Sequence, residues 1–154
     1  MKLPLILILI TIAVAGCTTR RSYLATFDPR VTVCDLAYPG YDCAANLGGD
    51  IGVTGGGFTW GGQPDESQTA VSEAFALTDG LNADFDTDGF MRALADRVAR
   101  DLKTAGFDSD LAVTGSDAVV DYHAASTRGH LELKAHRAPG MLVVDVSGHE
   151  GIEK

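Results

Sequence analysis

A change of hydrophobic period near Gly106 divides the C-terminal part of the chain into a helical segment and a strand-forming segment. From about Gly89 to Ala105, apolar residues recur at spacings of three and four, as they do on one face of an amphipathic helix. This stripe comprises Met91, Ala95, Val98, Leu102 and Ala105, with Phe90 and Leu94 beside it. Charged residues fill the other side, so the pattern predicts a helix with one buried face.

Local residues also predict the two ends of this helix. The aspartates that precede it suit the positive end of the helix dipole, and Asp88 or Thr87 is expected to cap the first turn. Gly106 suits the C-terminal cap, and Phe107 is expected to fold back onto the helix.

Beyond Gly106 the sequence changes to a strand pattern, seen in three segments at 118–122, 131–135 and 141–146. Pro139-Gly140 can close a two-residue hairpin between the last two. In that register Lys134 faces Asp145, Leu133 faces Val146 and Ala135 faces Val144. One face is then apolar and the other charged, as in a sheet that a helix covers on one side. We therefore expect an α+β fold: a mainly antiparallel sheet of about five strands with one amphipathic helix packed on one face.

The segment before the helix has a weaker pattern. Val31-Thr32-Val33 is expected to begin the first strand. Residues 46–64 hold eight glycines, with Ile51-Gly52-Val53 and Phe58-Thr59-Trp60 as strand fragments, joined by glycine turns or a flexible loop. This segment contains no Lys and no Gly-Lys-Ser/Thr, so it is not a phosphate-binding loop. Gln63 to Thr69 is predicted to be a polar connector.

The N-terminus has the composition of a secretory signal. From Leu3 to Gly16 only Thr11 is polar, and one Lys precedes this run. A helix of that length would reach about 21 Å, which is short of the roughly 30 Å hydrocarbon core of a membrane. We expect residues 1–16 to be a cleaved signal peptide.

The end of this signal, Val14-Ala15-Gly16-Cys17, resembles the lipobox of bacterial lipoproteins. The resemblance implies cleavage before Cys17 and acylation of that residue, and more than one acyl chain gives a stable membrane anchor. Residues 17–22 would then be the lipidated Cys and its tether, and 23–154 a single periplasmic domain. Thr18, in place of the Asp that often retains enteric lipoproteins, favours the outer membrane. The alternative is an ordinary signal followed by a coincidental Cys.

Cys34 and Cys43 remain once Cys17 is assigned to lipid. An even pair in an oxidising compartment indicates a disulfide. The intervening Tyr38-Pro39-Gly40-Tyr41 fits a type II turn, which would bring the two thiols near each other. Two free buried thiols are the alternative.

The charge distribution excludes some partners. The chain from Cys17 onward has 11 basic and 21 acidic residues, and no Lys or Arg occurs from Val31 to Met91. Nucleic-acid binding needs clustered basic residues and is not expected. Attraction to anionic lipid is not expected either, which leaves the acyl chains as the membrane contact.

Asp84-Phe85-Asp86-Thr87-Asp88-Gly89 matches the first half of an EF-hand calcium loop, with oxygen ligands at positions one, three and five and glycine at six. Position twelve is Ala95, where the motif requires a bidentate Glu. The three aspartates are therefore candidate Ca²⁺ ligands, and helix capping is the competing interpretation. No other cofactor is predicted.

Two histidine groups are further candidates. The hairpin register places His130 opposite His149 with Glu132 on the same face, a set that can bind zinc. Solvated histidines near strand ends are the competing interpretation. His123 with Asp121 and Ser126 could be a fragment of a catalytic triad, although no nucleophile elbow accompanies it.

From Phe58 onward the order of features resembles an uncharacterised lipoprotein domain, one of the families of unknown function. The matching residues are Phe58 and Trp60, Gly106 and Phe107, Asp117, Val120 and Tyr122, and Gly140, Leu142, Val143 and Asp145. The Asp-x-x-Val-x-Tyr and Gly-x-Leu-Val-x-Asp motifs are short and mostly structural. The resemblance implies one more strand after these motifs and no established activity, so it supplies no catalytic residues.

The expected function is a membrane-anchored lipoprotein with a non-enzymatic structural, assembly or accessory role in the cell envelope, with an envelope protein as its partner. A calcium-binding lipoprotein that uses Asp84, Asp86 and Asp88 is the alternative, and an envelope hydrolase ranks below it.

Overall fold

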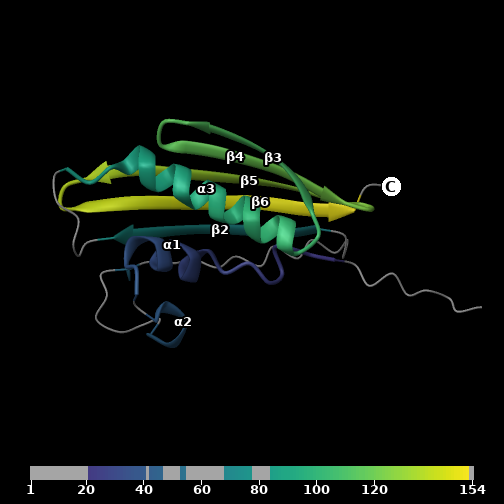
Figure 1. Ribbon diagram of the computed structural model, residues 1–154, viewed down its shortest axis with the longest axis horizontal. Coiled ribbons are helices and arrows are strands. Elements are labelled where there is room, and N and C mark those ends of the chain that lie inside the picture. The colour runs from purple at the N-terminus through teal and green to yellow at the C-terminus, as the bar shows by residue number, and fades with distance from the viewer. Residues whose placement is uncertain (1–20, 41, 47–52, 55–67, 78–83, 153–154) are drawn as a thin grey trace, which may run out of the picture.

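The computed structural model describes residues 21–40, 42–46, 53–54, 68–77 and 84–152. These residues form a sheet whose one face is covered by helices (Figure 1). The elements are α1 (Pro29–Ala37), α2 (Cys43–Asn46), β1 (Val53–Thr54), β2 (Gln68–Leu77), α3 (Thr87–Thr104), β3 (Asp108–Thr114), β4 (Asp117–Ala124), β5 (Thr127–Ala138) and β6 (Met141–Ile152).

The sheet has six strands in the order β1-β2-β6-β5-β4-β3, and every neighbouring pair is antiparallel. Strands β3 to β6 follow one another as hairpins, and β6 then pairs with β2 from the other side. Helix α3 connects β2 to β3 across the intervening strands (Figure 1). The predicted α+β fold with a mainly antiparallel sheet is confirmed.

The hairpin register is also confirmed. Lys134 pairs with Asp145, Leu133 with Val146 and Ala135 with Val144. Gly140 has φ +74°, the left-handed conformation that a tight hairpin turn requires. Alternation along the two strands therefore directs one set of side chains toward the helices and the other away from them.

Helix α3 spans nearly the predicted residues, but its N-terminal cap differs. The cap is Asp86, whose Oδ1 accepts a hydrogen bond from the Gly89 N–H at 2.9 Å, and both Thr87 and Asp88 lie in the helix. Capping by Thr87 or Asp88 was therefore wrong by one or two residues, because several oxygen-bearing side chains compete for the position.

The C-terminal end of α3 is as predicted. Gly106 has φ +86°, its N–H donates to the Lys103 carbonyl, and the Phe107 N–H donates to the Leu102 carbonyl. These two bonds form a Schellman motif. Phe107 is buried and so folds back against the core.

Two expectations for the N-terminal half are wrong. Val31-Thr32-Val33 lies within α1, because Asp28 caps the helix by accepting from the Val31 N–H and Pro29 occupies its first turn. Such a helix start outweighs the strand preference of β-branched residues. The predicted connector 63–69 ends too late, since β2 already begins at Gln68; residues 63–67 lie outside the described part.

The core lies between the helices and one face of the sheet. Its fully buried members include Met91, Leu94, Val98 and Leu102 from α3 and Val120, Leu131, Leu133 and Val144 from the strands. Cys34 at the end of α1 forms the predicted disulfide with buried Cys43, and Gly40 between them has the positive φ of a type II turn.

Several predicted features lie outside the described residues: the signal peptide 1–16, Cys17, Thr18 and the Phe58-Thr59-Trp60 fragment. Of the Ile51-Gly52-Val53 fragment, only Val53 is described, in β1. None of the helices in the described part is long and apolar enough to cross a membrane.

Candidate functional site

The sheet face opposite the helices, here called the open face, carries all four histidines of the chain. His123 lies on β4, His130 and His136 on β5, and His149 on β6. On each strand the histidines alternate with residues that are buried in the core, such as Leu131, Leu133 and Ala135 on β5. Strand alternation alone therefore gathers the histidines on one surface.

Antiparallel pairing extends this gathering across four strands. Asp110 pairs with Asp121, Asp121 with His130, and His130 with His149. This row forms part of a shallow recess of about 560 Å³. The recess is lined by Asp110, Asp121, Tyr122, His123, Arg128, Gly129, His130 and His149.

His130 contacts two carboxylates. Its Nδ1 lies 2.7 Å from Asp121 Oδ1 and its Nε2 lies 3.4 Å from Glu132 Oε1. The hydrogen bond to Asp121, reinforced by Glu132, raises the pKa of His130 above its ordinary value. With both ring nitrogens protonated, the imidazolium donates to both carboxylates.

The network continues along β5 and across to β6. Lys134 Nζ lies 3.0 Å from Glu132 Oε2, and this contact, together with the bond to His130, lowers the pKa of Glu132. The His149 ring lies 5.5 Å from the His130 ring, centroid to centroid. Further along β5, His136 Nδ1 lies 3.6 Å from Asp145 Oδ2 on β6.

The proposed zinc ligands lie near one another, but in the described part of the chain they do not form a metal-binding set. His130 faces His149 as the register predicts. Among the described residues, no three His, Cys, Asp or Glu side chains come together as a metal ion needs.

The suggested triad fragment is not assembled, because Asp121 contacts His130 rather than His123. The aspartates of the calcium hypothesis, Asp84, Asp86 and Asp88, are exposed and Asp86 serves as the cap of α3. They do not form a gathered ligand set in the described part of the chain. Calcium titration remains the test of that hypothesis.

A second polar centre, missed by the sequence reasoning, surrounds Glu150 on the helix-covered face. Glu150 has no exposed surface, and its Oε2 accepts from the N–H groups of Tyr23 at 2.8 Å and Leu24 at 3.3 Å and from the Tyr122 hydroxyl at 3.0 Å. Its Oε1 has no partner. The available signal was parity: Glu150 follows Val144 and Val146 at steps of two, on the apolar side of its strand.

Aromatic rings enclose this centre. Tyr23 stacks on Phe27 at 5.1 Å and meets Tyr122 edge-on at 5.6 Å. Burial raises the pKa of both tyrosines, and Glu150 adds to the effect at Tyr122. The Tyr122 ring lies over Gly129, where a Cβ would come within 2.0 Å of Tyr122 Cζ. Glycine at 129 therefore lets Tyr122 reach the carboxylate.

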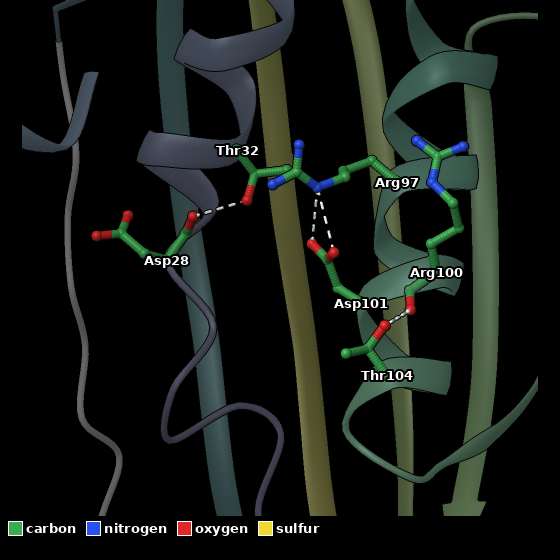
Figure 2. Close-up of polar contacts among 6 residues, drawn as sticks. All are labelled: Asp28, Thr32, Arg97, Arg100, Asp101 and Thr104. Atoms are coloured by element: carbon green, nitrogen blue, oxygen red, sulfur yellow. Dashed lines mark hydrogen bonds and ion pairs between the residues drawn. The ribbon is translucent and has the colours of Figure 1, made fainter. Parts of the chain in front are cut away.

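A groove of about 430 Å³ separates the 23–32 segment from the C-terminal half of α3. Figure 2 shows polar residues that line it, Asp28, Thr32, Asp101 and Thr104, together with Arg97 and Arg100 of α3. Thr32 donates to the Asp28 carbonyl, Thr104 donates to the Arg100 carbonyl, and Arg97 Nε donates to both oxygens of Asp101. Each of these contacts joins residues four apart on one helix or its cap, and none of them bridges the groove. They serve the helices themselves.

Comparison of the chain with protein-family models, with curated proteins and with solved structures finds no match. Geometry and chemistry therefore decide between the candidate surfaces.

The open face is the strongest candidate. It carries the carboxylates of Asp108, Asp110, Asp117, Asp121, Glu132 and Asp145 and the cationic side chains of Arg128 and Lys134. These groups are exposed or half-buried and are held in rows by the strands, as in a polar binding surface. These carboxylates outnumber the cationic side chains even when the His130 imidazolium is included, so the open face complements a cationic partner.

Proposed function

We propose that this protein is a lipid-anchored accessory of the bacterial envelope that binds a partner on its open face without catalysis. The anchor is the acylated Cys17, and the location is the outer membrane on its periplasmic side. The partner is an envelope protein that presents basic groups to the carboxylates of the open face.

The row from Asp110 through Asp121 and His130 to His149 carries this proposal. Catalysis by charged groups depends on a site that excludes water, where electrostatic interactions are strong. The open face is the opposite case, because 65 % of the Asp121 side chain and 31 % of the His130 side chain are exposed. Such groups are suited to recognition across a wet polar interface.

The anchor is tested with Cys17→Ser in cells given an alkyne-tagged fatty acid. The wild-type protein should be labelled and processed, whereas the variant should be unlabelled and retain residues 1–16. Normal labelling of the variant would refute the anchor.

The binding face is tested by site-specific photo-crosslinking in the native envelope. A photoreactive residue at Ser147 on the open face should capture the partner, and Asp110→Asn with Asp121→Asn should weaken capture. The matched control is Ala93, exposed on α3, combined with Asp96→Asn. Capture of the same partner from Ala93 but not from Ser147 would overturn the proposal.

A further inference from the structure

The described chain begins at one end of the sheet and is fixed there. The Arg21 carbonyl accepts from Thr127 Oγ1 at 3.1 Å, and Thr127 pairs with Ile152 at the end of β6. The next residues are held by Glu150, which binds the backbone N–H groups of Tyr23 and Leu24. The chain therefore leaves the domain beside the turn between β4 and β5.

Covalent length limits how far this end can lie from an anchor at Cys17. Arg21 follows Cys17 by four residue steps, which span at most about 14 Å when fully extended. Strand β5 has 12 residues, so its far end at the Pro139-Gly140 turn lies about 40 Å away. The end of the sheet at Thr127 is therefore close to the anchor, whereas the end at the Pro139-Gly140 turn is far from it.

The surface at the near end differs from the rest of the domain. Ile152, 41 % exposed, is the sole exposed large hydrophobic residue in the described ranges. Arg21 is exposed, with its guanidinium next to Gly106 at the end of α3. Arg128 is exposed at the same end of the sheet, on the open face, where it pairs with Gly151. Arginines are attracted to anionic headgroups, and an isoleucine side chain favours the boundary with the acyl chains.

We propose that this anchor end, formed by Arg21, the Ala125-Ser126 turn, Arg128 and Ile152, lies on the headgroups of an anionic lipid surface, with the strands directed away from it. The inference rests on the proposed acylation of Cys17. Both faces of the sheet then stand clear of the lipid, and the open face points sideways toward its partner.

Two other orientations compete with this one. With the open face down, its carboxylates would meet headgroups of the same charge, which is unfavourable. With the helix face down, α3 would present Arg92, Arg97, Arg100 and Lys103 to the lipid. Asp96 and Asp101, the second paired with Arg97, offset part of that charge. The upright orientation alone keeps the Pro139-Gly140 turn away from the lipid.

The test uses full-length, acylated protein in vesicles of phosphatidylethanolamine and phosphatidylglycerol that carry a headgroup-attached nitroxide quencher. A fluorescent amino acid is placed at Ser126, Pro139, Ser147 or Ala93. Strong quenching at Ser126 with little at the other three positions is expected. The upright orientation would be overturned if Pro139 were quenched as strongly as Ser126 and if Ser147 or Ala93 were quenched as well.

A charge variant and its control sharpen the result. Arg21→Gln with Arg128→Gln should lower quenching at Ser126, whereas Arg92→Gln with Arg100→Gln should leave it unchanged; the reverse result would contradict the assignment of the surface. Intact-mass measurement of the same samples separates the two proposals. An unacylated Cys17 defeats the proposed function, whereas acylated protein with uniform quenching defeats only the orientation.

Discussion

Glu150 gathers three donors on one carboxylate oxygen at a position without contact to water. Hydrogen bonds to a charged group are stronger than those between neutral groups. When one of them is removed at a buried site, the group that loses its partner is left with the full free-energy cost of its desolvation. This side chain therefore links two distant parts of the chain, the 23–24 segment and the end of β6. Its neighbours allow a matched pair of variants.

Tyr122→Phe and Tyr23→Phe each remove one phenolic hydroxyl, and the two hydroxyls have different surroundings. The Tyr122 hydroxyl donates to Glu150, so its loss should lower the free energy of unfolding by about 2 kcal/mol. The Tyr23 hydroxyl is buried without a partner, so its loss should leave stability unchanged or raise it by up to about 1 kcal/mol. Urea denaturation of both variants measures the difference, and equal losses would contradict the assigned hydrogen bonds.

His130 should make stability depend on pH. Its pKa is raised in the folded protein, chiefly by the hydrogen bond to Asp121, so protonation favours the folded state. The stabilisation is fully present below the unfolded-state pKa of about 6.5 and is lost as the pH rises through the folded-state pKa. An NMR titration of the ring should show the raised pKa, and Asp121→Asn should lower it more than Glu132→Gln does. The opposite order would contradict the assigned main cause.

At the scale of elements, the best predictions came from signals that act over a few residues. The α3 stripe, the Gly106-Phe107 ending and the Pro139-Gly140 hairpin each depend on neighbours in the chain, and all three are present. The strand β2 was missed because its pairing with β6 joins segments far apart in sequence. The prediction of a strand at 31–33 is wrong because the capping residues before this segment decide its conformation.

The cap of α3 gives a test at this scale that also bears on calcium. Asp86→Ala removes the acceptor for the Gly89 N–H and should cost about 1 kcal/mol of stability. Asp84→Ala, outside the cap, should cost a few tenths of that. Thermal unfolding with and without millimolar calcium checks both effects. A stabilisation by calcium that either substitution abolishes would instead favour the metal loop.

At the scale of the whole molecule, the disulfide belongs to the helical layer and spans a short part of the chain. Cys34 and Cys43 are both buried and join the end of α1 to α2. Reduction should lower stability by about 2–3 kcal/mol, because a loop of this length gains that much freedom in the unfolded chain. The loss of amide protection should concentrate in α1 and spare β4 to β6. Hydrogen exchange of oxidised protein and of a Cys34→Ser/Cys43→Ser variant measures it, and uniform loss of protection would contradict this localisation.

The candidate site was predictable to the extent that one hairpin determines it. The register around Pro139-Gly140 places His130 opposite His149, and the sequence predicts that pair correctly. Asp110 and Asp121 join the row through β3 and β4, whose pairing the sequence analysis did not derive. Parity along β6 could have placed Glu150 on the buried face, but its partners could not be predicted, because Tyr23 is 127 residues away in the chain.

The strand order has a consequence for when the sheet can be completed. Strand β6, the last described strand in the chain, lies between β2 and β5 in the middle of the sheet. During synthesis the edge of β2 that pairs with β6 therefore stays unpaired until residues 141–152 have been made. Long-range pairing of this kind forms slowly. The two halves of this sheet, β1-β2 and β5-β4-β3, can therefore be joined only after the last described strand has been made.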